Sequence, residues 1–308
     1  MIDRNVPDVR SRKGLRRRLV DVISAGLAPW KLRRNWEPRP VSDLQSQSGL
    51  PLVISLTSYP RRFLTLERTI KSLLVQTVEK KRVILWIAYP DVTLIPSSVV
   101  RLKQDGLEIR EIDDYCSHKK YLGAFRDFPD HAILLCDDDT DYWPSWAEEL
   151  LAASHTFPDS ICCHRAHQIL LDADGLPQPY HQWLQKLDKT AQGPLIFATG
   201  MGGVLYPPHS LHPKALDSRT AIRLCPTGDD IWLYWMARLA GREFRQIGPR
   251  RQFAQWAGSQ RNALWRINNG RESGNDKQIS GMIKAFGVDV FKEAGRLEAS
   301  HTTISTAP

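Results

Sequence analysis

Three adjacent carboxylates follow a short apolar run in the middle of the chain. Residues 133–136 read Ile-Leu-Leu-Cys, and Asp137, Asp138 and Asp139 come directly after them. An apolar run of this length is typical of a parallel strand that is buried on both faces. Aspartates have poor strand propensity, so we expect them just beyond the strand, at the sheet edge where α/β proteins bind ligands. Carboxylates there suit a divalent cation that also binds substrate phosphates, and a solvated acidic turn is the alternative.

A second pair of carboxylates opens a predicted helix near residue 229. The segment reads Cys-Pro-Thr-Gly from residue 225, followed by Asp229 and Asp230 and then by apolar residues that favour a helix over 229–240. An aspartate at a helix N-terminus is commonly a cap, and this explains Asp229 well. Asp230 falls inside the first turn, where it could face a cleft and act as a general base.

Glycines and basic residues complete the candidate chemistry. Residues 200–203 read Gly-Met-Gly-Gly, which permits close approach of the backbone to a ligand, and no Gly-Lys-Ser/Thr follows that would make a Walker loop. Arg61, Arg62, Lys119 and Lys120 precede or follow predicted strands and could offset diphosphate charge. Single basic residues of this kind are more often solvated surface residues.

The elements that must position these residues follow an alternating order. The pattern predicts strands at 52–57, 82–88 and 107–112, and helices at 64–74 and, more weakly, at 96–103. Strands that alternate with helices indicate βαβ units and a parallel sheet, whose right-handed crossovers bring the carboxyl ends of the strands to one edge.

Beyond residue 160 the pattern changes. Short apolar pieces between Gly and Pro turns predict antiparallel or mixed strands, and a helix is expected at 276–286 before a flexible tail. The short strands are expected at 161–164, 169–172, 194–198 and 203–206.

Composition indicates a soluble intracellular protein with a basic extension. The 308 residues carry a net charge of +8, but residues 1–40 hold eleven basic and four acidic residues, which leaves the remainder near neutral. Five cysteines form no regular framework, and no apolar run is long enough to span a membrane. We therefore expect a cytoplasmic protein, with no signal peptide.

The basic extension itself has an amphipathic pattern. Leu15, Leu19, Val22, Ile23 and Leu27 recur at helical spacing, and most of the arginines lie off that stripe. Such a helix suits an anionic membrane surface, which residues 10–34 would contact at the inner face of the membrane. The alternatives are a helix docked on the body or an arm that binds nucleic acid. We favour the membrane and expect no nucleic-acid partner.

Together these motifs resemble those of the nucleotide-diphospho-sugar glycosyltransferases of the GT-A fold, in particular the bacterial family-2-like branch. The resemblance spans about residues 50–240, and residues 275–278 resemble a further piece of it. We therefore expect a GT-A domain at 49–250, between a basic extension with an amphipathic helix at 1–48 and a C-terminal extension with a helix and a flexible tail at 251–308, and apart from residues 275–278 both extensions lie outside the resemblance. The implied fold is a Rossmann-like, mostly parallel sheet flanked by helices, with a smaller mixed sheet in the C-terminal half. The matching segments are residues 54–62, 119–121, 137–139, 202–207 and 227–233.

The resemblance implies a donor site built on the first and fourth strands. Asp137 and Asp139 would bind Mn²⁺ or Mg²⁺ together with the donor diphosphate. The residues expected to contact the donor nucleotide are Thr57, Tyr59, Arg61, Lys120, Asp137 and Asp138.

It also implies a base and a sugar site. Asp230 would deprotonate the acceptor hydroxyl in an inverting displacement, although the family often has Glu-Asp at this point, so Asp229 is the alternative base. Gly202, Gly203 and Trp232 would contact the acceptor or the donor sugar. The implied activity is transfer of a sugar to a glycan or glycolipid in surface polysaccharide biosynthesis.

Two other functions fit part of the pattern. A nucleotidyltransferase also pairs a parallel sheet with carboxylates and a metal, but residues 58–62 after the first strand contain no glycine. A non-catalytic carbohydrate-binding or assembly protein on the same fold would use the ten tryptophans equally well for sugar stacking.

Overall fold

The computed structural model describes residues 51–249, 251–256, 259 and 274–292. The predicted basic extension at 1–48, including residues 10–34, lies outside the described residues, as does most of the tail after residue 286. Within the described ranges, no helix has the length and apolar character needed to cross a membrane.

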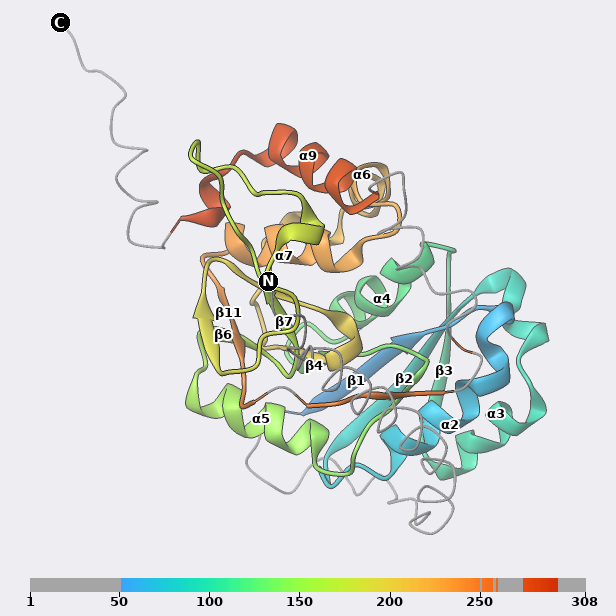
Figure 1. The fold of residues 1–308 in the computed structure, drawn as a ribbon. Coiled ribbons are helices and arrows are strands. Elements are labelled where there is room, and N and C mark those ends of the chain that lie inside the picture. Colours follow the sequence, from blue (N-terminus) through green and yellow to red (C-terminus); the bar gives the residue numbers. More distant parts are fainter. Residues whose placement is uncertain (1–50, 250, 257–258, 260–273, 293–308) are drawn as a thin grey trace, which may run out of the picture.

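One sheet of eight strands forms the centre of the molecule, in the order β3-β2-β1-β4-β10-β6-β11-β8 (Figure 1). The first four strands in this order are parallel, β10 runs antiparallel to both of its neighbours, and β6 and β11 are again parallel. The strands are β1 (Leu52–Thr57), β2 (Lys81–Ala88), β3 (Leu107–Ile112), β4 (Ala132–Leu135), β6 (Ser160–Cys163), β8 (Ala191–Gly193), β10 (Val204–Tyr206) and β11 (Glu243–Gln246). Two short antiparallel pairs are added by β5 (Thr140–Asp141) with β12 (Ala254–Gln255) and by β7 (Ala166–Gln168) with β9 (Ile196–Ala198).

Helices cover both faces of the sheet (Figure 1). One face packs against α4 (Lys119–Asp127), α6 (Ser218–Leu224), α7 (Asp229–Leu239) and α9 (Gly274–Phe286). The other packs against α2 (Phe63–Leu74), α3 (Ser97–Arg101) and α5 (Trp146–Thr156). Short 3₁₀ turns lie at Pro60–Arg62, Tyr89–Leu94, Leu102–Asp105, Cys116–His118, Tyr180–Gln182, Gly200–Gly202, Pro213–Leu216 and Asp289–Phe291.

The parallel strands are buried on both sides, as their apolar sequences predict. In β4, Ile133 and Leu135 belong to the core under α4 and α7, whereas Ala132 and Leu134 belong to the core over α2 and α5. A strand with this environment needs no polar alternation, which is why it reads as a continuous apolar run.

The predicted α/β class and the mostly parallel sheet are confirmed. The mixed strand directions expected in the C-terminal half are also observed, because β10, β6, β11 and β8 continue the main sheet. One predicted strand is misplaced: residues 169–172 follow β7 and lie outside the strands, except for an isolated bridge at Leu171. The apolar residues there instead pack against the core around Tyr180 and Phe197.

The topology gathers several loops at the carboxyl edge of β1 and β4. These two strands are parallel, so the segments after Thr57 and Leu135 leave the sheet at the same edge. Strand β10 is antiparallel to β4 and begins there, with Val204 opposite Leu135. The glycine-rich turn Gly200–Gly202, which precedes β10, is thereby brought to the three aspartates.

Candidate active site

A cavity of about 1130 Å³ opens at this edge of the sheet. Its lining comes from the ends of β1 and β4, from α4, from the turn at residue 200 and from the start of α7. It therefore unites the three aspartates after β4 with the two aspartates of α7, although about ninety positions separate them in the sequence.

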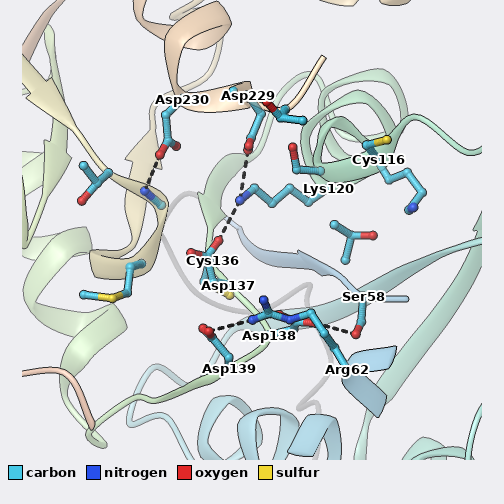
Figure 2. A pocket seen from close by; sticks show the side chains of 18 of the residues that line it. Ser58, Arg62, Cys116, Lys120, Cys136, Asp137, Asp138, Asp139, Asp229 and Asp230 are labelled. Carbon is cyan, nitrogen blue, oxygen red and sulfur yellow. Dashed lines mark hydrogen bonds and ion pairs between the residues drawn. The ribbon is translucent and has the colours of Figure 1, made fainter. Parts of the chain in front are cut away.

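Asp138 and Asp139 are held by a single buried arginine. Arg62 Nη2 lies 2.7 Å from Asp138 Oδ1 and 2.7 Å from Asp139 Oδ2, and Ser58 Oγ donates a hydrogen bond to Asp138 Oδ2 (Figure 2). Burial disfavours the charge on Arg62, but the adjacent aspartates outweigh burial and raise its pKa. Burial raises the pKa of Asp138 to about 6, even though Arg62 acts in the opposite direction. Arg62, Asp138 and Asp139 form a compact ion cluster at the wall of the cavity.

Asp137 faces the cavity and is bridged to α7 by Lys120. Lys120 Nζ donates to Asp137 Oδ1 at 2.9 Å and lies 3.0 Å from Asp229 Oδ2, while 34% of the Asp137 side chain stays exposed (Figure 2). Burial opposes ionisation of Asp137, but Lys120 more than compensates and the pKa of the carboxyl is lowered. For Lys120 itself, burial is likewise outweighed by Asp137 and Asp229, so its pKa is raised. One ammonium group thus joins the two carboxylate clusters.

Asp230 has a different environment. Its Oδ2 accepts a hydrogen bond of 3.0 Å from the backbone N–H of Gly200 (Figure 2), and no cation in the described part of the chain forms an ion pair with it. Burial and the neighbouring charge of Asp229 raise the pKa of Asp230 to about 7. A carboxylate with such a pKa is suited to accept a proton near neutral pH.

Gly200 keeps open the space between these groups. A β-carbon at this position would lie 3.1 Å from Asp137 Oδ1, 3.2 Å from Lys120 Nζ and 3.3 Å from Asp230 Oδ1. Gly200 is not among the glycines with positive φ, so its backbone does not itself require glycine. Three charged groups therefore border a small space beside Gly200. The space is open because this residue has no side chain.

The position of Lys120 depends on packing within the sheet. Ser55 Oγ of β1 donates a hydrogen bond of 2.6 Å to the carbonyl oxygen of Lys120, and Trp86 Nε1 donates to Ser55 Oγ at 3.0 Å. Helix α4 lies directly on the Trp86 ring, because a β-carbon on Gly123 would come within 2.5 Å of it. A close helix–sheet contact of this kind requires glycine.

Helix α9 holds the loop before α7. Gln278 Oε1 accepts a hydrogen bond from the backbone N–H of Thr227, and Asn275 lines the cavity. Asp276 Oδ1 accepts from the backbone N–H of Tyr180. The segment 275–278, which resembles a family motif, thus connects the C-terminal helix to the site.

The structure brings most of the predicted donor residues together. Thr57, Tyr59 and Arg61 line the cavity beside Lys120 and the aspartates. The Thr57 hydroxyl is engaged within the fold, since it donates to the carbonyl oxygen of Trp86 at 2.8 Å.

The three predicted sugar contacts do not line the cavity. Trp232 is fully buried, and its Nε1 donates to the carbonyl oxygen of Ala215. A β-carbon on Gly202 would lie 2.5 Å from Arg165 Cβ. Gly203, with φ of 81°, lies against the Trp146 ring, which a β-carbon would approach to 2.2 Å. Both glycines are explained by packing within the protein, whereas their neighbour Gly200 lines the cavity.

Two residues at the centre of the site were not assigned to it from the sequence. Arg62 was considered only as one of several basic residues, and Gly200 only as part of a glycine-rich run. Which of two adjacent arginines turns inward depends on the 3₁₀ turn Pro60–Arg62, which leaves Arg61 exposed. Gly200 reaches the aspartates because β10 runs antiparallel to β4. The sequence of a short apolar strand does not reveal its direction, so this position could not be predicted.

The donor set fits a hard divalent cation through Asp137. Mg²⁺ and Mn²⁺ are commonly bound by one or two carboxylates together with substrate phosphates, and Asp137 offers an exposed carboxylate in the cavity. Asp139, the second predicted ligand, is 6% exposed and paired with Arg62. No group of three or more His, Cys, Asp or Glu residues within the described ranges is arranged to hold a metal by itself. Phosphate oxygens would therefore be needed to complete such a site.

Comparisons with known proteins give matches to solved structures alone. No family model and no curated protein matches the chain. Among 127 matching chains of solved structures is the crystal structure of GalNAc-T7 with UDP, GalNAc and Mn²⁺, with a TM-score of 0.45 and 10% sequence identity over 80% of this chain. The aligned region spans 58% of that chain. A similarity at this level assigns no substrate or metal to the present protein.

Proposed function

We propose that this protein is a glycosyltransferase that moves a sugar from a nucleotide-diphospho-sugar to a hydroxyl group of a glycan or glycolipid. The observation that carries the proposal is the convergence of Asp137, Lys120 and Asp230 on the space beside Gly200. A cation that could bind phosphate, Lys120, and a carboxylate with a raised pKa, Asp230, thus face the same small space, which suits a displacement at an anomeric carbon.

In this proposal each charged group has a separate task. Asp230 accepts the proton of the acceptor hydroxyl as the new bond to the anomeric carbon forms, which favours an inverting displacement. Lys120 and the arginines after β1 stabilise the negative charge of the departing nucleoside diphosphate. A divalent cation bound through Asp137 would supply further Lewis-acid stabilisation.

The biological setting that we propose is surface polysaccharide biosynthesis in the cytoplasm. Basic residues 10–34 would hold the enzyme at the anionic inner face of the membrane, close to a lipid-linked acceptor. Deleting residues 1–36 should then abolish flotation with anionic vesicles and leave nucleotide binding unchanged. Flotation that persists in the deletion variant would overturn the membrane part of the proposal.

The proposed function is tested by thermal stabilisation of the full chain with nucleoside diphosphates and nucleotide sugars, with and without Mn²⁺ or Mg²⁺. A ligand that binds only the folded state stabilises it by about 2.7 kcal/mol at one hundred times its Kd. We expect a shift with one nucleotide that increases with the metal, and we expect Asp137→Asn to lose that increase. Asp130→Asn, which alters an aspartate that is 80% exposed and outside the cavity lining, is the matched control.

The other outcomes identify the alternatives. No shift with any nucleotide would favour a non-catalytic carbohydrate-binding protein. Release of pyrophosphate from a nucleoside triphosphate and a sugar phosphate would indicate a nucleotidyltransferase. Release of a nucleoside diphosphate from a nucleotide sugar supports the glycosyltransferase.

A further inference from the structure

One wall of the cavity differs from the rest in its charge. It is formed by residues 165–199 and contributes Arg165, His167, Tyr180, Lys186 and Phe197 to the lining. We call these five residues the basic wall. Every carboxylate in the lining comes from elsewhere, namely from Asp91, Asp114, Asp137, Asp138, Asp139, Asp229 and Asp230.

The basic wall is built on a buried neutral histidine. His167 of β7 is 2% exposed, and its Nδ1 accepts a hydrogen bond of 2.9 Å from the backbone N–H of Lys186. Burial, followed by the charge of Arg165 and to a lesser extent that of Lys186, lowers the pKa of His167 to about 3. The ring therefore stays uncharged, and the positive charges of this wall are those of Arg165 and Lys186 beside it.

One cation of the basic wall, Arg165, is held in place by its side-chain contacts, and the other, Lys186, by its backbone. Arg165 Nη1 donates a hydrogen bond to Thr199 Oγ1, and Gly202 packs against Arg165 Cβ. Lys186 has a left-handed backbone, with φ of 59°, a conformation that is costly for lysine and is imposed here by the loop around His167. The side chain of Arg165, anchored in this way, loses little freedom when it binds a ligand.

Aromatic rings adjoin the two cations. Tyr180 packs against His167 at 5.8 Å and against Phe197 at 6.1 Å between ring centroids. The segment that carries Tyr180 contacts α9, because the backbone N–H of Tyr180 donates a hydrogen bond to Asp276 Oδ1. Burial and then the charge of Asp230 raise the pKa of Tyr180, so this wall is within electrostatic range of the proposed base. Tyr180 and Asp230 line the same cavity, so a sugar that stacks on Tyr180 would lie in the space that Asp230 also faces.

We infer that the basic wall receives an anionic group of the acceptor sugar, either the carboxylate of a uronic acid or a phosphate ester. This inference rests on the proposed function, because it takes the side of the cavity that faces Asp230 as the acceptor side. Arg165 and Lys186 bind the anion, and the ring of Tyr180, which is supported from behind by the buried Phe197, contacts the apolar face of the sugar ring.

The inference is tested by ligand-observed NMR titration of the full chain with three sugars: methyl β-D-glucuronide, glucose 6-phosphate and the neutral methyl β-D-glucoside. We expect at least one of the anionic sugars to bind about tenfold more tightly than the glucoside. Preference for the glucuronide alone identifies a carboxylate, and preference for the phosphate alone identifies a phosphate ester. Equal affinity for all three sugars would overturn the inference.

Variants of Lys186 make the test specific to the wall. Lys186 is exposed, so Lys186→Met should fold and should reduce the preference for the anionic sugar to less than threefold, while Lys186→Arg should retain it. Lys189→Met is the control, since Lys189 is an exposed lysine of the same segment that does not line the cavity. A preference that survives in Lys186→Met would also overturn the inference.

The nucleotide panel separates this inference from the proposed function. If nucleotides stabilise the protein but the three sugars bind equally well, the inference of an anionic acceptor is wrong and the proposed function remains. Discrimination among the sugars without any nucleotide binding removes the glycosyltransferase and, with it, the acceptor assignment.

Discussion

The cavity contains two pairs of neighbouring aspartates that the fold treats differently. Asp138 and Asp139, after β4, share the guanidinium group of Arg62 and lie almost wholly buried. At the start of α7, Asp229 is paired with Lys120, whereas Asp230 receives only a backbone N–H from Gly200. The first pair shares a cation supplied by the protein itself, and the second leaves one carboxylate without a countercharge of its own. Similar sequence pairs therefore have different electrostatic environments, and the proposed function assigns proton transfer only to the second.

The largest effect is expected at the unpaired carboxylate. Asp230→Asn removes the base and should lower kcat by about 10³-fold, because general base catalysis commonly contributes 10²- to 10⁴-fold. The amide keeps an oxygen that can accept the N–H of Gly200, so the affinity for the donor nucleotide should not change. Steady-state kinetics and a nucleotide titration measure both quantities. Activity close to that of the unmodified enzyme would exclude Asp230 as the base and remove the functional difference between the two pairs.

The paired carboxylates should respond in stability. Arg62→Met leaves Asp138 and Asp139 buried without their shared cation, which should cost about 3 to 5 kcal/mol in the free energy of unfolding. Protonation relieves this repulsion, so the loss should be smaller at pH 5 than at pH 8, and urea denaturation at both values measures it.

Arg61→Met provides the matched control for Arg62, because Arg61 is exposed and adjacent in the sequence. Its effect on the free energy of unfolding should be below about 0.5 kcal/mol. Equal effects of the two substitutions would contradict the structural role assigned to Arg62.

Filling the space between Asp137 and Asp230 should affect turnover without affecting the fold. Gly200→Ala places a methyl group within 3.3 Å of Asp137, Lys120 and Asp230, and we expect a loss of about 10² in kcat from displaced reacting groups. Gly281→Ala, where a β-carbon on α9 meets nothing closer than 3.7 Å, is the control and should leave kcat unchanged. An unchanged kcat in Gly200→Ala would show that the reaction occurs elsewhere in the cavity.

The smallest effect is a displacement of the pH profile. The acidic limb of kcat/KM in the unmodified enzyme should follow the pKa of Asp230, which is about 7. Asp229 raises that pKa by its charge, so Asp229→Asn should move the limb to lower pH, where Asp230 then loses its proton. A limb that stays in place would mean that another group controls the profile.

The sequence was a good guide to the elements and a weaker guide to the contacts. The strands β1 and β3 fall at the predicted residues, because buried parallel strands and amphipathic helices leave strong apolar patterns. The sequence also indicated the three aspartates after β4 and the pair at α7, and the structure places all five at one cavity.

The contacts that escaped prediction depend on tertiary packing. Trp232 lies on the apolar face of α7, and its side chain is buried in the core. Its position two residues after Asp230 in the sequence therefore did not indicate a contact with a sugar. The roles of Gly200, Gly202 and Gly203 differ because Arg165 and Trp146 come from distant segments and fill the space beside two of the three. No local pattern encodes those approaches.

The link between α9 and the start of α7 has a consequence for how the protein is made. The loop that presents Asp229 and Asp230 is bonded through Thr227 to Gln278, and Asn275 forms part of the cavity. A ribosome releases the first four strands of the sheet long before it releases these residues. The nascent chain can therefore pair its four parallel strands β1 to β4 early, but the cavity is completed only when the segment around residue 278 has left the exit tunnel. The lining of the cavity is thus assembled well after the first half of the sheet that carries it.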